Sequence, residues 1–266
     1  MLTRSLSCLL LSVILLPACA GGDVPTVGAV PADDDLCLPS YDAARCDAHA
    51  ALPAPVLHWS YDERVPGGVL DTGADGTDGW FTGSPTFGAG LLGDAMLLDG
   101  SSWLLADDAV ALDGARFTLA TWVRSVEGDN PGPHHFLMSN GNGSPAFTGA
   151  SLLVDDDGAA RGLIEGGSAV RERLPTGPAI CSDGWAHVAV TFDHGDIEVF
   201  VDGVSAGVTA VEYDEVVWGL RRFGVGNDPN NLSRAFIGEV DETMVFDAAL
   251  SSSALLDLRT AALCAR

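Results

Sequence analysis

The feature that most constrains this chain is a rhythm of short apolar runs, each ended by turn residues, that starts near Pro53 and continues almost to the C-terminus. Apolar runs of this length, bounded by Gly, Pro, Asn or Asp about every ten residues, are typical of strands. The 32 Gly and 14 Pro residues also leave little room for long helices. The rhythm therefore predicts an all-β domain.

The clearest strand lies in the segment 116–123, in which both sets of alternate residues are largely apolar. Successive side chains of a strand point to opposite faces of the sheet. One face would therefore carry Phe117, Leu119 and Val123, and the other Thr118, Ala120 and Trp122. Both faces of this strand are expected to be covered.

Two Asp-rich segments predict hairpin turns. Residues 155–158 separate apolar runs at 151–154 and 161–164, and residues 193–196 separate runs at 187–192 and 197–201. An Asp-Gly step supplies the positive φ that such turns need, so we interpret the three acids at 155–157 as turn residues and not as a metal site. Near the end, Ser251 can cap a helix whose apolar residues recur at spacings of three and four: Leu255, Leu258 and Ala262.

The first 18 residues have the pattern of a secretory signal peptide, with Arg4, no acid and an apolar run at 6–16. That run is shorter than the roughly 20 residues of a membrane-spanning helix. It ends in Leu16-Pro17-Ala18-Cys19, which resembles the lipobox of bacterial lipoproteins. The resemblance implies a lipid on Cys19 and, because no Asp follows Cys19, an exported protein of the outer membrane or cell surface. The alternative is cleavage after Ala18 that leaves an unlipidated secreted protein.

Composition divides the remainder of the chain into a tether and a domain. Residues 19–50 are rich in Gly, Pro, Ala and Asp with little periodicity, which predicts a flexible tether. Residues 51–266 show no further break of this kind and are long enough for one sandwich with a full core. We therefore expect one domain beyond the leader and the tether.

The charge of the chain excludes one class of partner. All 13 basic residues are arginines and face 37 acids, so the formal net charge is −24. A field of this sign repels phosphate backbones and anionic lipid, so we expect no nucleic-acid binding and no membrane contact beyond the lipid anchor. It suits divalent cations, although an acid excess also keeps an exported protein soluble.

Cysteine usage suggests disulfides. Loss of the leader and lipidation of Cys19 leave four cysteines: Cys37, Cys46, Cys181 and Cys264. An even number in an exported chain suggests two disulfides, and the missing Cys-x-x-Cys spacing disfavours zinc. Three connectivities are open. We favour Cys37–Cys46 with Cys181–Cys264, because the first pair closes a short loop outside the domain.

Three segments carry recognisable motifs. Residues 88–100 read GAGLLGDAMLLDG, residues 184–192 and 200–203 read GWAHVAVTF and FVDG, and residues 236–251 read FIGEVDETMVFDAALS. Together they resemble the laminin-G-like members of the concanavalin-A-like lectin/glucanase superfamily, over residues 54–263. The resemblance implies a two-sheet antiparallel β-sandwich of the jelly-roll type, to which the capped segment adds a short C-terminal helix.

The same resemblance implies a structural Ca²⁺. In several members of the superfamily an Asp on the last strand and acids after the first strand bind calcium together. The matching residues are Asp241 with Asp62 or Glu63, and Asp99 is a further candidate. Ca²⁺ takes six to eight oxygen ligands, which such side chains, carbonyls and waters can supply. The alternative is that Asp241 hydrogen-bonds neighbouring backbone N–H groups.

The sequence does not favour catalysis. Glycosidases of the superfamily carry the pattern E-I-D-x-x-E, whereas residues 239–244 read EVDETM and lack the last acid. Retaining hydrolysis needs two carboxyl groups about 5 Å apart, and no other strand with paired acids is evident. We interpret His187 as a sheet-packing residue. His134 and His135 are adjacent, so they would point to opposite faces and not chelate one metal.

We therefore expect a surface-anchored, non-catalytic binding module for a polysaccharide or a cell-surface protein. The alternatives are a structural or interaction lipoprotein without sugar affinity and, third, a glycoside hydrolase of the same superfamily. Planar aromatic rings on a sheet face would favour a glycan ligand. The available rings are Trp80, Phe81, Trp103 and Trp218, each of which could instead pack in the core or under a loop.

Overall fold

The computed structural model describes residue 46 and residues 52–110, 112–125, 130, 134–140, 148–166, 171–173, 179–180, 184–218, 222–227 and 234–266. All of these residues belong to one compact unit, Asp33–Arg266. The leader, Cys19 and the tether up to Cys46 lie outside the described residues, as do Cys37 and Cys181. In the part of the chain that the structure describes, no helix has both the length and the apolarity to cross a membrane.

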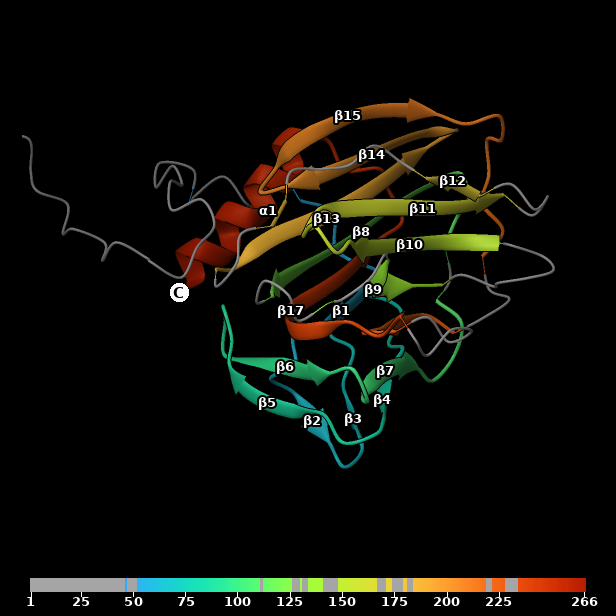
Figure 1. Ribbon diagram of the computed structural model, residues 1–266. Coiled ribbons are helices and arrows are strands. Elements are labelled where there is room, and N and C mark those ends of the chain that lie inside the picture. Colours follow the sequence, from blue (N-terminus) through green and yellow to red (C-terminus); the bar gives the residue numbers. More distant parts are fainter. Residues whose placement is uncertain are drawn as a thin grey trace, which may run out of the picture. The chain divides into compact units, whose positions relative to one another are not determined.

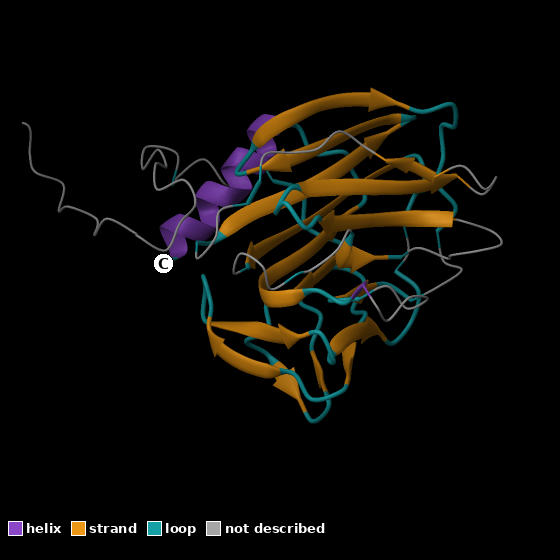
Figure 2. Ribbon diagram, in the orientation of Figure 1, coloured by secondary structure: helices purple, strands orange, loops and turns teal. Residues whose placement is uncertain are grey.

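The described residues form two antiparallel sheets and a C-terminal helix, so the predicted fold class is confirmed (Figures 1 and 2). Sheet I consists of β1 (Leu57–Trp59), β5 (Thr86–Ala89), β6 (Asp94–Asp99), β8 (Arg116–Arg124), β13 (Ala186–Asp193), β14 (Asp196–Val201), β15 (Val204–Ala210) and β17 (Ile237–Phe246). Its order is β15-β14-β13-β8-β17-β6-β5, and β1 also pairs with β17.

Sheet II lies across the core from sheet I. It consists of β2 (Arg64–Val65), β3 (Gly68–Val69), β4 (Gly79–Thr82), β7 (Trp103–Ala106), β9 (His135–Ser139), β10 (Thr148–Val154), β11 (Ala160–Gly166), β12 (Arg171–Arg173) and β16 (Gly224–Val225). Its order is β12-β11-β10-β9-β16-β7-β4-β3-β2. The chain crosses between the sheets repeatedly, as a jelly roll requires.

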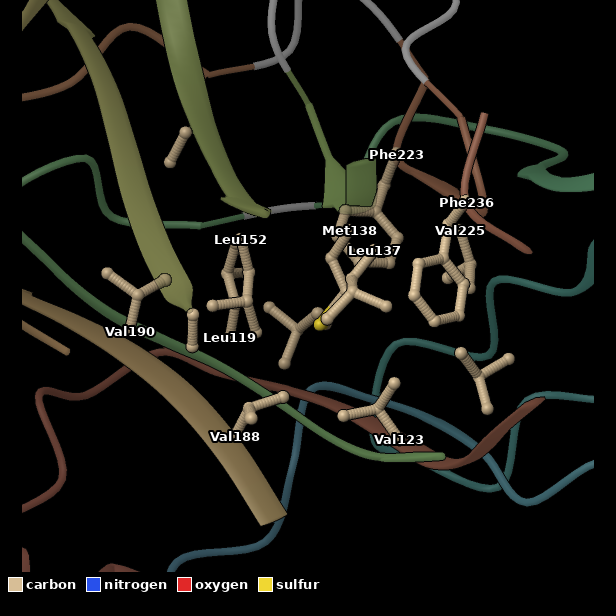
Figure 3. Packing of buried hydrophobic residues seen from close by; sticks show 14 of the residues in the cluster. Leu119, Val123, Leu137, Met138, Leu152, Val188, Val190, Phe223, Val225 and Phe236 are labelled. Carbon is tan, nitrogen blue, oxygen red and sulfur yellow. The ribbon is translucent and has the colours of Figure 1, made fainter. Parts of the chain in front are cut away.

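The central strand β8 has the two faces that its alternation predicts. Phe117, Leu119 and Val123 are fully buried in the core between the sheets. Figure 3 shows Leu119 and Val123 in this core together with Met138 and Leu152 of sheet II. On the opposite face, Ala120 and Trp122 are also buried, in two smaller clusters that include residues of the C-terminal helix. The prediction that both faces are covered is confirmed.

Both predicted hairpins are present. Val154 pairs with Ala160 across the turn between β10 and β11, and Asp193 pairs with Asp196 across the turn between β13 and β14. In the second turn His194 and Gly195 have φ angles of 48° and 94°. Two successive positive φ angles match the right-handed twist of the flanking strands, which explains the Gly at this place.

The C-terminal helix α1 (Ser252–Ala265) begins where the sequence predicts. Ser251 caps it, because its side chain accepts the N–H of Ala254 at 3.3 Å. Leu255 is buried with Ala120, Phe200 and Phe246 on the outer face of sheet I. In Figure 1 the helix lies beside the ends of β13, β14 and β15. One outer face of the sandwich is therefore covered by α1.

A buried ion pair holds α1 on the sheet. Asp202, in the turn between β14 and β15, accepts hydrogen bonds from Arg259 Nε at 2.9 Å and from the His187 N–H at 3.1 Å. The side chains of Arg259 and Asp202 are only 2% and 1% exposed. At the next residue, Gly203, a Cβ would lie 3.1 Å from the Leu256 Cβ. Asp202 and Gly203 of the second motif therefore form the contact on which α1 packs.

This ion pair predicts a large and specific loss of stability. Asp202→Ala removes one partner of this buried ion pair, a change that typically costs about 3–5 kcal/mol. Denaturant unfolding should show this loss in the free energy of unfolding. The control is Asp193→Ala, which removes an ion pair with Arg116 whose side chains are more than half exposed and should cost less than about 1 kcal/mol. Equal losses in the two variants would contradict the role given to Asp202.

The disulfide pairing differs from the favoured one. Cys46 is bonded to Cys264 on α1, with a Cα–Cα distance of 5.7 Å and a sequence separation of 218. The predicted pairing of Cys37 with Cys46 and of Cys181 with Cys264 is therefore wrong. Its error was to treat Cys46 as part of the tether alone, whereas that residue is bonded to the end of the helix. The bond joins the entrance of the domain to its last element.

Candidate functional site

Asp241 of β17 is completely buried and binds backbone N–H groups. Its Oδ1 accepts the Glu242 N–H at 2.8 Å, and its Oδ2 accepts the Leu92 N–H at 2.9 Å. A bulge in β17 between Asp241 and Met244 gives Glu242 a φ of 50°. The pKa of Asp241 is raised to about 7, mainly by burial and also by the nearby Glu242 carboxylate, against the lowering effect of the N–H donors.

Asp62 holds the same loop from the other side. Its Oδ1 accepts the Asp94 N–H at 2.6 Å. A Cβ at Gly93 would lie 2.1 Å from that oxygen, and one at Gly90 would lie 2.5 Å from Asp241 Oδ2. The expectation that the first strand lies beside the last is confirmed, since Leu57 pairs with Val245. The two glycines of the first motif therefore let both carboxylates reach the loop.

The four candidate calcium ligands do not form one site. Glu63 is exposed, and Asp99 accepts the N–H and Oγ of Ser101 in the turn after β6, which lowers the pKa of Asp99. Asp62 and Asp241 meet N–H donors, which repel a cation. Within the described ranges no group of three or more His, Cys, Asp or Glu is placed to hold a metal. The geometry thus fits the hydrogen-bonding alternative for Asp241 and does not fit Ca²⁺.

Calcium should therefore leave the stability of the domain unchanged. A bound ion would add about 2.7 kcal/mol to the free energy of unfolding at a hundredfold excess over its dissociation constant. We expect the same melting temperature in millimolar CaCl₂ and in chelator, for the wild type and for Asp241→Asn. A rise in calcium that is lost in Asp241→Asn, but kept in Asp156→Asn at the exposed turn, would restore the calcium site.

The raised pKa of Asp241 predicts a pH dependence with a definite sign. The folded protein keeps this proton up to about pH 7, whereas the unfolded chain releases it near pH 3.8. The stability that Asp241 contributes is therefore greatest at low pH and falls as the pH rises through this window. The free energy of unfolding of the wild type, relative to Asp241→Asn, should decrease between pH 4 and 7. A flat difference across this range would contradict the assignment.

The other acids of the β17 motif also have partners. Glu239 is ion-paired with Arg124, and Glu242 lies 2.7 Å from His58 Nε2 on β1. His187 of the second motif is buried with its ring edge-on to Trp122, at 5.3 Å between centroids. The pKa of His187 is lowered to about 3, mainly by burial and also by the Arg259 charge. These signature residues organise sheet I and its helix.

The four aromatic candidates separate into two groups. Phe81 packs against the core, with 5.5 Å between its ring centroid and that of Phe87. Trp218 lies edge-on to Phe117, with 4.8 Å between the ring centroids. By contrast, Trp80 is 43% exposed and Trp103 is half-buried. Trp80 is the most exposed of the four rings, and Trp103 is not among the half-buried residues that pack against the core, as Phe81 and Trp218 are.

Trp80 and Trp103 lie on the outer face of sheet II. Trp80 on β4 is directly opposite Leu105 on β7, and Trp103 is two residues from Leu105 and so points to the same side. The Trp80 ring rests over β3, where a Cβ at Gly67 or Gly68 would lie 3.7 or 3.3 Å from Trp80 Cε3. We call the surface formed by Trp80, Trp103 and Leu105 the Trp80 face. It carries no charge of its own.

A polar cluster occupies the same outer face near the turn between β10 and β11. Asp155 is buried; its Oδ1 lies 2.8 Å from His134 Nδ1, and its Oδ2 pairs with Arg161. His135 instead lies 2.9 Å from the Ala235 carbonyl oxygen through its Nδ1, so the two histidines have separate partners, as predicted. The sequence predicts a turn at Asp155 but not its partners, because the His134 ring and the Arg161 guanidinium come from other segments of the chain.

Comparison with known proteins supports the fold. Domain 4 of AbnA, an extracellular arabinanase of Geobacillus stearothermophilus, in complex with arabinotriose, has a TM-score of 0.62 and 20% identity and covers 78% of this chain and 99% of its own. The binding domain of Paraclostridial Mosquitocidal Protein 1 has a TM-score of 0.61 and 14% identity over 77% of this chain and 52% of its own.

A relative is also found by sequence. Adhesion G-protein coupled receptor V1 of Danio rerio is 23% identical over 150 residues, which are 54% of this chain and only 2% of the receptor. The chain therefore spans a very small part of that receptor. A family model described as the concanavalin A-like lectin/glucanases superfamily matches residues 98–255, more than half of the chain. The chain belongs to the laminin-G group of the concanavalin A-like lectin/glucanase superfamily.

Proposed function

We propose that this protein is an exported, non-catalytic module that binds a polysaccharide through the Trp80 face. The observation that carries the proposal is the exposed indole of Trp80, whose six-membered ring packs against Gly67 and Gly68 at the edge of sheet II. The apolar faces of sugar rings stack on such platforms, because a large planar ring buries apolar area at low entropic cost. Trp103 and Leu105 extend the platform to the neighbouring strand.

Two further points support a binding role. The similar arabinanase domain is described in complex with arabinotriose, and the toxin domain as a binding domain. In this chain, the acids of the β17 motif are engaged with Arg124, His58 and backbone N–H groups. With a lipid on Cys19, the module would hold its ligand at the cell surface.

Trp80→Ala tests this function. Removing the ring should weaken binding at least about tenfold, because its buried apolar area accounts for roughly 1.5–3 kcal/mol. The melting temperature should change little, since Trp80 is largely exposed. Affinity electrophoresis of the soluble protein in gels with arabinan, xylan or β-glucan measures the loss. Val208→Ala, at a 59% exposed residue on β15 of sheet I, is the control.

Two results would count against the proposal. If the wild type and Trp80→Ala are retarded equally by every polysaccharide that binds, the Trp80 face is not the site. If none of the polysaccharides retards the wild type and a glycan array is also negative, the structural or protein-binding alternative is correct.

A further inference from the structure

Arg161 differs from the other arginines in the way its guanidinium is held. It pairs with Asp155 through Nε, and its side chain is 23% exposed. Asp155 also accepts the His134 backbone N–H at 3.2 Å and lies 2.8 Å from the His134 ring, so this carboxylate is fully used. The terminal nitrogens Nη1 and Nη2 of Arg161 form no ion pair with described residues. The end of the guanidinium is thus available to a further acceptor.

The four other arginines in the described ion pairs are held differently. Arg124 uses both Nε and Nη2 on Glu239. Arg64 donates from Nη1 to the Tyr61 carbonyl oxygen and pairs through Nη2 with Asp94. Arg259 is buried, and Arg116 is more than half exposed and is held only at Nε. Arg161 alone among these five combines a free end with a buried support.

Arg161 lies next to the strand that carries two further arginines. In the strand register Arg161 lies opposite Leu153, which belongs to an apolar cluster with Phe136 and Leu163 that is separate from the main core. This places Arg161 on the outer face of sheet II. On the next strand, β12, the backbone positions of Arg171 and Arg173 lie opposite Glu165 and Leu163. Three arginines of a chain with only 13 basic residues therefore occupy two neighbouring strands.

We propose that Arg161, supported by Asp155 and His134, is a second recognition point that binds an anionic group of the glycan, a carboxylate or a sulfate. The planar guanidinium fork matches both groups and gives stronger hydrogen bonds than a neutral donor. The net charge of −24 does not prevent this at physiological salt, because charges beyond about 8 Å are screened. The inference rests on the proposed function in one respect, that the ligand is a glycan.

The test compares three polymers at 0.15 M NaCl: polygalacturonate, its fully methyl-esterified form and dextran sulfate. We expect the wild type to bind polygalacturonate or dextran sulfate at least tenfold more tightly than the methyl ester. Arg161→Gln should lose this preference, and Arg161→Lys should retain part of it. Arg116→Gln, which removes the same charge from an exposed ion pair, should behave as the wild type. Melting temperatures of all variants show that each is folded.

The outcomes separate this inference from the proposed function. Three results would overturn the role of Arg161. They are equal binding of the methyl ester and polygalacturonate, no binding of either anionic polymer, and equal effects of Arg161→Gln and Arg116→Gln. If Arg161→Gln does not fold, the partial preference of Arg161→Lys decides. A wild type that binds only neutral polysaccharides, in a manner lost in Trp80→Ala, would refute the anionic recognition point and leave the Trp80 face intact.

Discussion

The loops of this sandwich depend on carboxylates that accept backbone N–H groups. Asp71 accepts the N–H groups of His58, Gly73 and Thr77, which organises the Gly-rich loop before β4. Asp241 and Asp62 do the same for the loop before β6. A carboxylate that satisfies several buried donors costs less to bury than an isolated one. In this acidic chain, many of the acids that suggest a cation site thus act as internal acceptors.

This use of acids explains why the family motifs contain both Gly and Asp. Gly90 leaves the space that the Asp241 carboxylate fills, and Gly93 leaves the space for Asp62. Each glycine is therefore required by the acid that it faces. The same logic applies to Asp202 and Gly203, where the acid holds Arg259 and the glycine lets Leu256 approach. The motif residues make contacts between loops, strands and the helix. The motifs therefore indicate how the domain packs and do not by themselves indicate its function.

The elements that local patterns specify were predictable, and the contacts between distant segments were not. The alternation in 116–123 gave both faces of β8, and the Ser251 cap gave the start of α1, because strands and helices express their period within one segment. The Cys46–Cys264 bond joins residues 218 positions apart, and no local pattern selects it from three connectivities. Arg259 and Arg161 were missed for the same reason, since their partners lie on other elements. The nearness of Asp62 and Asp241 was predicted, but the N–H donors around them were not.

The two outer faces of the sandwich differ in what covers them. On sheet I, the helix covers Ala120 and Phe200 and is fixed by the buried Asp202–Arg259 pair and by the disulfide at Cys264. The chain itself therefore covers this part of the outer face of sheet I. On sheet II, Trp80 keeps 43% of its surface exposed although the chain could have buried it, as it buried the aromatic residues of β8. An exposed indole can bury further apolar area when a ligand covers it. This exposed ring is the feature of sheet II that supports the proposed binding face.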